Sequence, residues 1–239
     1  RRIELPAGMV TKGAEQIRRS SEAVEILAEH LPTLDADLLE KLSQWSEDLP
    51  KANTMSHAML MEKVLLLEWF IGRVSRPGGK EEMIGMLVVQ AGNAEPAAQY
   101  KDISQQEMVA GLIELRAVYD KLIEIVKLPP DDVDEAAENL IEKLELTGPA
   151  EMFASFLLPA IGKMRRSEAA YQTRQVMLRA AIAVVKGDRS QLERKELHDP
   201  YGPGPFEYLK TKGGFMLRSK LLDRKGEPVI LSVGPASDQ

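Results

Sequence analysis

Apolar residues recur at steps of three and four through most of the chain, from residue 10 to residue 186. This spacing is typical of α-helices that bury one face. The most regular segment spans residues 104–127 and carries Met108, Leu112, Leu115, Tyr119, Leu122 and Val126. A chain with this period over most of its length is expected to fold as a mainly α protein.

The same spacing and the positions of proline and glycine predict the other helices. We expect them at about residues 11–30, 35–49, 56–74, 80–90, 131–146 and 149–186. In the second, Leu38, Leu42, Trp45 and Leu49 share one face. The third is apolar almost all round, which predicts a central, enclosed helix. Asp131 or Asp132 is expected to cap the helix that ends near residue 146, and Pro159 to break or kink the last helix.

The composition changes after Gly187, and short β-type runs replace the helical pattern. We expect strands at about 206–209, 215–221 and 229–233, separated by glycine-containing turns that need positive φ. A meander of roughly 35 residues is too small to be stable alone and should dock on the helices. The prediction is therefore an all-helical body over residues 1–187 and a Pro/Gly turn with a three-stranded antiparallel β-meander over residues 188–239.

Composition excludes several classes of function. The chain has 239 residues, no cysteine and a net charge of −6. Disulfides, thiolate metal sites and cysteine nucleophiles are impossible, and a nucleic-acid partner is not expected. No run of apolar residues is long enough for a transmembrane segment. Because the chain begins with Arg1 instead of methionine, we expect a processed or truncated chain whose signal or membrane anchor has been removed.

Metal, cofactor and nucleophile motifs are not expected either. His30, His57 and His198 are far apart in the sequence, and no glycine-rich phosphate loop or nucleophile elbow is present. The carboxylates over residues 131–145 could form a cation-binding face, but an ordinary solvated helix face is the favoured interpretation. We predict no cofactor, no metal and no catalytic residue from these motifs.

Glu62 and Glu68 interrupt the most apolar helix and are therefore candidate buried carboxylates. A carboxyl group buried among apolar side chains can have a raised pKa and serve as a general acid. The alternative is an ion pair with an arginine or lysine from a neighbouring helix, and this alternative is favoured.

The C-terminal segment carries a recognisable pattern. Residues 197–208 read Leu-His-Asp-Pro-Tyr-Gly-Pro-Gly-Pro-Phe-Glu-Tyr, followed by Gly213-Gly214-Phe215 and then Leu231-Ser232-Val233-Gly234. This resembles the tail of type II secretion major pseudopilins. It is more similar still to extracytoplasmic proteins of planctomycetes and related bacteria that combine a helical body with such a meander. The missing apolar N-terminal helix, and the lack of acidic residues beyond Gly234 other than Asp238, argue against a pilus subunit and bound calcium.

The resemblance implies an extracytoplasmic or periplasmic location, anchoring through a missing N-terminal segment, and a protein partner at the cell envelope. The turn residues themselves suggest a structural role. The Asp199 carboxylate can accept backbone N–H bonds and Pro200 fixes φ. Tyr201, Phe206 and Tyr208 supply apolar area that holds the meander on the helices.

Three hypotheses for function follow. The first is a non-enzymatic cell-envelope protein for assembly or protein interaction. The second is a helical scaffold that binds a peptide or an apolar ligand in a groove lined by some of its 11 methionines. The third is an enzyme that uses Glu62 or Glu68.

Overall fold

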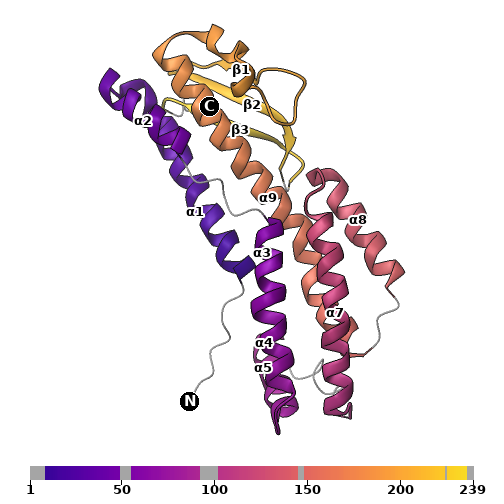
Figure 1. Cartoon of the computed structure of the whole chain (residues 1–239). Coiled ribbons are helices and arrows are strands. Elements are labelled where there is room, and N and C mark those ends of the chain that lie inside the picture. Colours follow the sequence, from indigo (N-terminus) through magenta and orange to yellow (C-terminus); the bar gives the residue numbers. More distant parts are fainter. Residues whose placement is uncertain (1–8, 49–54, 92–101, 145–147, 224, 236–239) are drawn as a thin grey trace. The chain divides into compact units, whose positions relative to one another are not determined.

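The computed structural model describes residues 9–48, 55–91, 102–144, 148–223 and 225–235 (Figure 1). Over these residues the chain is helical up to Lys186 and ends in a small sheet, which confirms the mainly α fold with a C-terminal meander. The helices are α1 (Met9–His30), α2 (Ala36–Asp48), α3 (Met55–Met61), α4 (Glu68–Val74), α5 (Gly79–Ala91), α7 (Gln105–Ile125), α8 (Pro130–Lys143) and α9 (Pro149–Lys186). A π-helical segment, η2 (Glu62–Leu67), joins α3 to α4. The short 3₁₀ turns are η1 (Leu31–Thr33), η3 (Arg189–Glu193) and η4 (Lys195–Leu197).

The chain forms two compact units. Unit 1 comprises residues 1–13 and 53–165, and unit 2 comprises residues 14–52 and 166–239. The long helix α9 contributes to both. Helix α9 ends at Lys186, and the sheet belongs to unit 2 together with the helical segments on which its apolar face packs.

Unit 1 is a helical bundle with a core rich in methionine. Its largest helix, α7, begins where the sequence predicts, because Ser104 and Glu107 form a capping box. The Ser104 Oγ accepts a hydrogen bond from the Glu107 N–H at 3.1 Å, and the Glu107 carboxylate accepts one from the Ser104 N–H at 2.7 Å. The buried side chains of the bundle include Met55, Met59, Met83, Met108, Leu112, Leu115, Tyr119, Leu122 and Val126.

The helix from Met55 to Val74 is not enclosed on all sides, so that prediction is wrong. Its buried side includes Met59 and Leu67, whereas Leu60, Val64 and Leu65 are about half exposed. In the π-helical segment each backbone hydrogen bond joins residues five apart instead of four. The side chains of the apolar run therefore spread over more of the helix surface than the neighbouring helices cover.

Two further helix ends differ from the prediction. Helix α8 begins at Pro130, and Asp131 and Asp132 lie in its first turn instead of capping it. Proline suits this first position because the N–H that it lacks would have no partner inside the helix. Helix α9 continues through Pro159, so the predicted break does not occur there, and the alternative of a kink stays a prediction.

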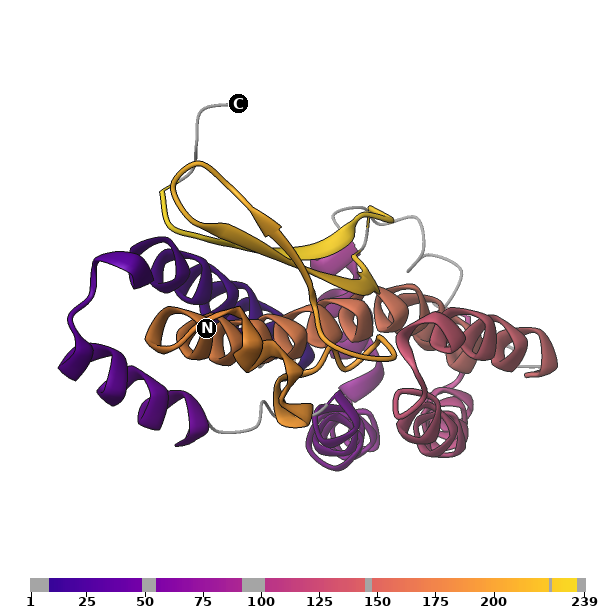
Figure 2. The ribbon, with the colours of Figure 1, turned by 90° about the horizontal axis from the view of Figure 1, so that it is seen from above.

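Unit 2 contains the sheet, with the strands β1 (Glu207–Lys210), β2 (Phe215–Leu222) and β3 (Pro228–Val233) in the order β1-β2-β3. Both pairs are antiparallel, as predicted. One face of the sheet is apolar and packs on α1 and α9 (Figure 2). The residues of that face are Phe215, Leu217, Leu221, Val229, Leu231 and Val233.

The hydroxyl of Thr173, in the part of α9 that belongs to unit 2, gives a stability prediction. Thr173 is fully buried, and no group in the described part of the chain hydrogen-bonds to its Oγ1. A buried hydroxyl without a partner costs about 1–3 kcal/mol, and valine has the same shape without that group. We expect Thr173→Val to raise the free energy of unfolding by about 1 kcal/mol in urea denaturation.

Ser219→Ala is the matched control, because Ser219 is equally buried but has partners. Its Oγ donates to Asp199 Oδ1 at 2.8 Å and accepts from the Leu221 N–H at 3.0 Å. The same measurement should show a lower free energy of unfolding for Ser219→Ala. If Thr173→Val lowered it as well, the Thr173 hydroxyl would have a partner in solution and the prediction would be wrong.

Candidate functional site

Asp199, the first of the predicted turn residues, is buried and joins its own turn to strand β2. Its Oδ1 accepts hydrogen bonds from the Tyr201 N–H at 3.0 Å and the Ser219 hydroxyl at 2.8 Å. Its Oδ2 accepts one from the Lys220 N–H at 2.6 Å. Strand β2 departs from regular pairing with β3 between Arg218 and Leu222. The carboxylate therefore accepts a backbone N–H bond where the pairing of the sheet is irregular.

The aromatic residues around this turn pack as the sequence suggests. Phe206 is buried in the core of unit 2, and Tyr201 and Tyr208 are partly buried against it. The Tyr208 ring stacks on the Phe215 ring with centroids 5.0 Å apart, and the Arg189 guanidinium lies 5.1 Å from the Tyr208 ring centre. Pro200 is exposed. These contacts hold the chain before β1 on the sheet, which is a structural role and not a reactive one.

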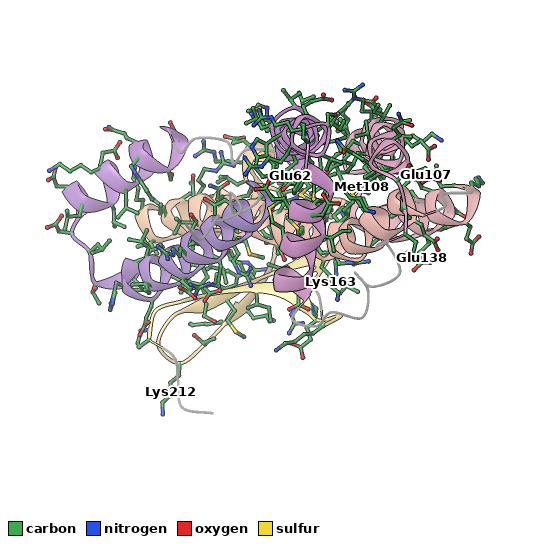
Figure 3. The ribbon with its side chains drawn as sticks, turned by 90° about the horizontal axis from the view of Figure 1, so that it is seen from below. Glu62, Glu107, Met108, Glu138, Lys163 and Lys212 are labelled. Atoms are coloured by element: carbon green, nitrogen blue, oxygen red, sulfur yellow. The ribbon has the colours of Figure 1, made fainter. Side chains whose placement is uncertain are left out.

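The two candidate carboxylates of the apolar helix have different surroundings. Glu62 is 5% exposed and lies at the start of the π-helical segment, inside the helices of unit 1 (Figure 3). Burial raises the pKa of the Tyr119 phenol, and the negative charge of Glu62 raises it further. Tyr119 is therefore held in its protonated form and is not available as a base.

Glu68 is not a buried carboxylate, and the favoured alternative, an ion pair with an arginine of a neighbouring helix, is confirmed for it. Its side chain is 42% exposed and accepts hydrogen bonds from Arg116 Nε at 2.7 Å and Nη2 at 2.6 Å. The Arg116 side chain lowers the pKa of the Glu68 carboxyl group through these bonds. Glu68 lies on the exposed side of α4, where the Arg116 side chain of α7 reaches it. Glu62 and Glu68 thus do not form a pair of buried acids.

Neighbouring ion pairs fix the same helices to one another. Lys63 pairs with Asp120 of α7, and Arg73 of α4 pairs with Glu82 of α5. The Arg73 side chain lowers the pKa of Glu82, chiefly through the hydrogen bonds between them. These ion pairs connect neighbouring helices, and they leave the charges around the π-helical segment balanced.

Clusters that could hold a metal are absent among the residues that the structure describes. The carboxylates of α8 whose side chains the structure describes, including Glu138, are exposed (Figure 3). The methionines proposed to line a groove are mostly core residues, since Met59, Met83 and Met108 have no exposed surface. His30 and His57 are exposed, and the His198 Nε2 lies 3.2 Å from the Glu193 carbonyl oxygen.

Helix α2 carries a surface that the sequence pattern did not identify as exposed. Leu38 and Trp45 are 44% and 48% exposed, although they belong to the apolar stripe of the helix. The helix is instead anchored through Leu39 and Ser46, which are buried. Successive residues are about 100° apart around a helix, so the buried side is rotated by about a quarter turn from the stripe. We call Leu38, Leu42 and Trp45 the α2 apolar face.

Leu42 lies between the two sides of α2 and is only partly buried against the core of unit 2. The α2 apolar face therefore includes two large side chains with half of their surface in solvent. Single exposed apolar residues are ordinary, but an amphipathic helix that turns its stripe away from its own core is typical of a surface with a partner.

No family model matches the chain, and no curated protein or solved structure is similar to it. Among the described residues, none of the helices combines the length and apolar character needed to cross a bilayer.

Proposed function

We propose that this protein is a non-enzymatic interaction module of the cell envelope that binds a protein partner through the α2 apolar face. The observation that carries the proposal is the exposure of Leu38 and Trp45 on a helix that uses a different side to pack on its own unit. Covering half of a leucine and half of a tryptophan side chain would remove substantial apolar surface from water. Tryptophan is also the residue type most often found at the energetic centre of protein interfaces.

The remaining candidate features support an interaction role in preference to catalysis. The Asp199 turn and its aromatic neighbours are fully used in holding the sheet. Glu68 is paired with Arg116, and Tyr119 is held protonated beside Glu62. The location at the envelope rests on the resemblance of the C-terminal segment to extracytoplasmic proteins with a pseudopilin-like tail.

The proposal is tested in the cells that encode the protein, by fractionation combined with site-specific photo-crosslinking. A photoreactive amino acid is placed at Leu38 in one variant and at Glu47 in the other. Glu47 is exposed. At about 100° per residue, its position is about half a turn around α2 from Leu38 and Trp45, so it lies on the opposite side of the helix. We expect the full chain in the envelope fraction and one discrete adduct from position 38 only.

Two results would overturn the proposal. One is recovery of the protein with the cytosol alone. The other is an equal set of adducts from positions 38 and 47, which would show that the α2 apolar face makes no specific contact.

A further inference from the structure

The two edge strands of the sheet in unit 2 differ in how they are protected. Strand β1 has four residues, of which Glu207 and Lys210 are charged, and the Arg189 guanidinium lies 5.1 Å from the centre of its Tyr208 ring. Strand β3 has six residues, Pro-Val-Ile-Leu-Ser-Val, and none of them is charged. Short length and charged side chains are common means by which proteins keep the edge of a sheet from pairing with another chain. By this criterion β1 is protected and most of β3 is not.

The features that do protect β3 are confined to its start. Pro228 is its first residue, and the irregular pairing of β2 with β3 ends at Leu222, the residue opposite Pro228. Proline and irregular pairing both disfavour the addition of a further strand. From Ile230 to Val233 the pairing with β2 is regular. This part of β3 therefore presents a regular, uncharged edge.

The outer edge of β3 carries backbone groups that are available for pairing. In an antiparallel pair, a strand directs the N–H and C=O groups of alternate residues to one side, and those of the residues between them to the other side. Strand β2 occupies one side of β3. In the described part of the chain, the only backbone hydrogen bond from residues 228–235 to a segment outside the sheet joins the Gly234 N–H to the Ala28 carbonyl oxygen, at 3.2 Å. Gly234 lies just after the strand, so this bond leaves the outer edge of β3 itself unpaired.

We propose that this edge pairs antiparallel with the same edge of a second copy of the chain, which joins two three-stranded sheets into one continuous sheet. Two identical antiparallel strands are related by a twofold axis, so each supplies the donors and acceptors that the other needs. Strand β3 is already ordered within its sheet, whereas an extended peptide from another protein would lose conformational entropy on pairing. The edge is separate from the α2 apolar face, so the inference does not depend on the proposed function.

The side-chain pattern of β3 suits this pairing when Leu231 lies opposite Leu231 of the second copy. Val229 then lies opposite Val233, and these buried residues continue the apolar face that packs on α1 and α9. On the other face, Ile230 lies opposite Ser232. A shift by one residue would place buried side chains opposite exposed ones. No like charges meet in this register, because β3 has no charged residue.

The test is sedimentation equilibrium of the full chain between about 5 and 500 μM, with hydrogen exchange measured at both ends of this range. Pairing of one short strand buries less than the roughly 1,200 Å² of a standard stable interface, so we expect association in the upper part of the range. The average mass should rise toward twice that of one chain. The amides of residues 229–234 should exchange more slowly in the concentrated sample, because N–H groups bonded across the new pair are protected.

Two matched variants place the same charge on the two edges of the sheet. Ile230 of β3 and Leu209 of β1 are both partly exposed and lie on the outward face, opposite Arg218 and Met216 of β2. Ile230→Glu brings two carboxylates to diagonal positions of the proposed pair, about 7–8 Å apart. It should weaken association about tenfold or more, whereas Leu209→Glu should associate as the unchanged chain does.

A further variant covers the case in which Ile230→Glu does not fold, which circular dichroism would show. Ser232 is exposed, so Ser232→Glu adds the charge to the same edge without removing a packed side chain. We expect it to weaken association as well, because two carboxylates again lie at diagonal positions of the pair.

The inference is overturned if the chain stays monomeric up to about 500 μM. It is also overturned if Leu209→Glu weakens association as much as the β3 variants do, or if a dimer forms without slower exchange in β3. A dimer that Ile230→Glu and Ser232→Glu leave intact would lie on another surface, such as the α2 apolar face, and would equally overturn it. None of these variants alters the α2 apolar face, so the crosslinking result for the proposed function is decided separately.

Discussion

Replacing Asp199 by alanine is expected to lower the free energy of unfolding of unit 2 by about 4 kcal/mol. The carboxylate is buried and accepts hydrogen bonds from the Tyr201 N–H, the Ser219 hydroxyl and the Lys220 N–H. Removing it leaves these donors inside the protein without their acceptor, and each such donor costs about 1–3 kcal/mol. The losses are not fully additive because Ser219 and Lys220 are adjacent and relax together.

Urea unfolding measures this effect in each unit separately. In the Trp69→Phe background Trp45 reports on unit 2, and in the Trp45→Phe background Trp69 of α4 reports on unit 1. We expect Asp199→Ala to move the transition seen at Trp45 to lower urea. Asp199→Asn should have a smaller effect, because one of its two acceptor oxygens is kept.

Pro200→Ala is the control for Asp199→Ala, since Pro200 is adjacent but exposed. Its expected effect is below about 1 kcal/mol and comes mainly from the greater freedom of the unfolded chain. An Asp199→Ala variant as stable as Pro200→Ala would show that the turn does not depend on the carboxylate.

The sequence predicts the helices and strands well because each depends on local periodicity and local end signals. Ser104 caps α7 through a residue three positions away, and such a signal can be read directly from the chain. Which side of a helix is buried is not a local property. The stripe of α2 predicts burial of Leu38 and Trp45, yet its tertiary neighbours cover Leu39 and Ser46.

The site residues follow the same division. The hydrogen bond from the Tyr201 N–H to Asp199 spans two residues and is predictable from turn chemistry. The bonds from Ser219 and Lys220 come from a strand 20 residues further along, and no spacing rule indicates them. Similarly, Glu68 pairs with Arg116, which is 48 residues away in the chain. The sequence alone therefore could not decide whether Glu68 is buried or exposed in an ion pair.

A pair of glycines in α5 provides a prediction in which one chemical change has opposite effects. A Cβ atom at Gly79 would lie 2.2 Å from the carbonyl oxygen of Arg73 and 2.9 Å from that of Val74. Both are backbone atoms at the end of α4, so they cannot move aside as a flexible side chain does. At Gly85, in the same helix, a Cβ meets nothing within 4 Å, and the residue is exposed.

We expect Gly79→Ala to destabilise unit 1 by about 3 kcal/mol, because α4 and α5 must separate at their connection. Gly85→Ala should stabilise unit 1 by about 0.5–1 kcal/mol, because alanine has the higher helix propensity and restricts the unfolded chain. Urea unfolding followed at Trp69 in the Trp45→Phe background measures both changes. Equal and small shifts for the two variants would mean that α4 and α5 do not approach each other at Gly79 as closely as described, and a large loss for Gly85→Ala would exclude an exposed helical position there.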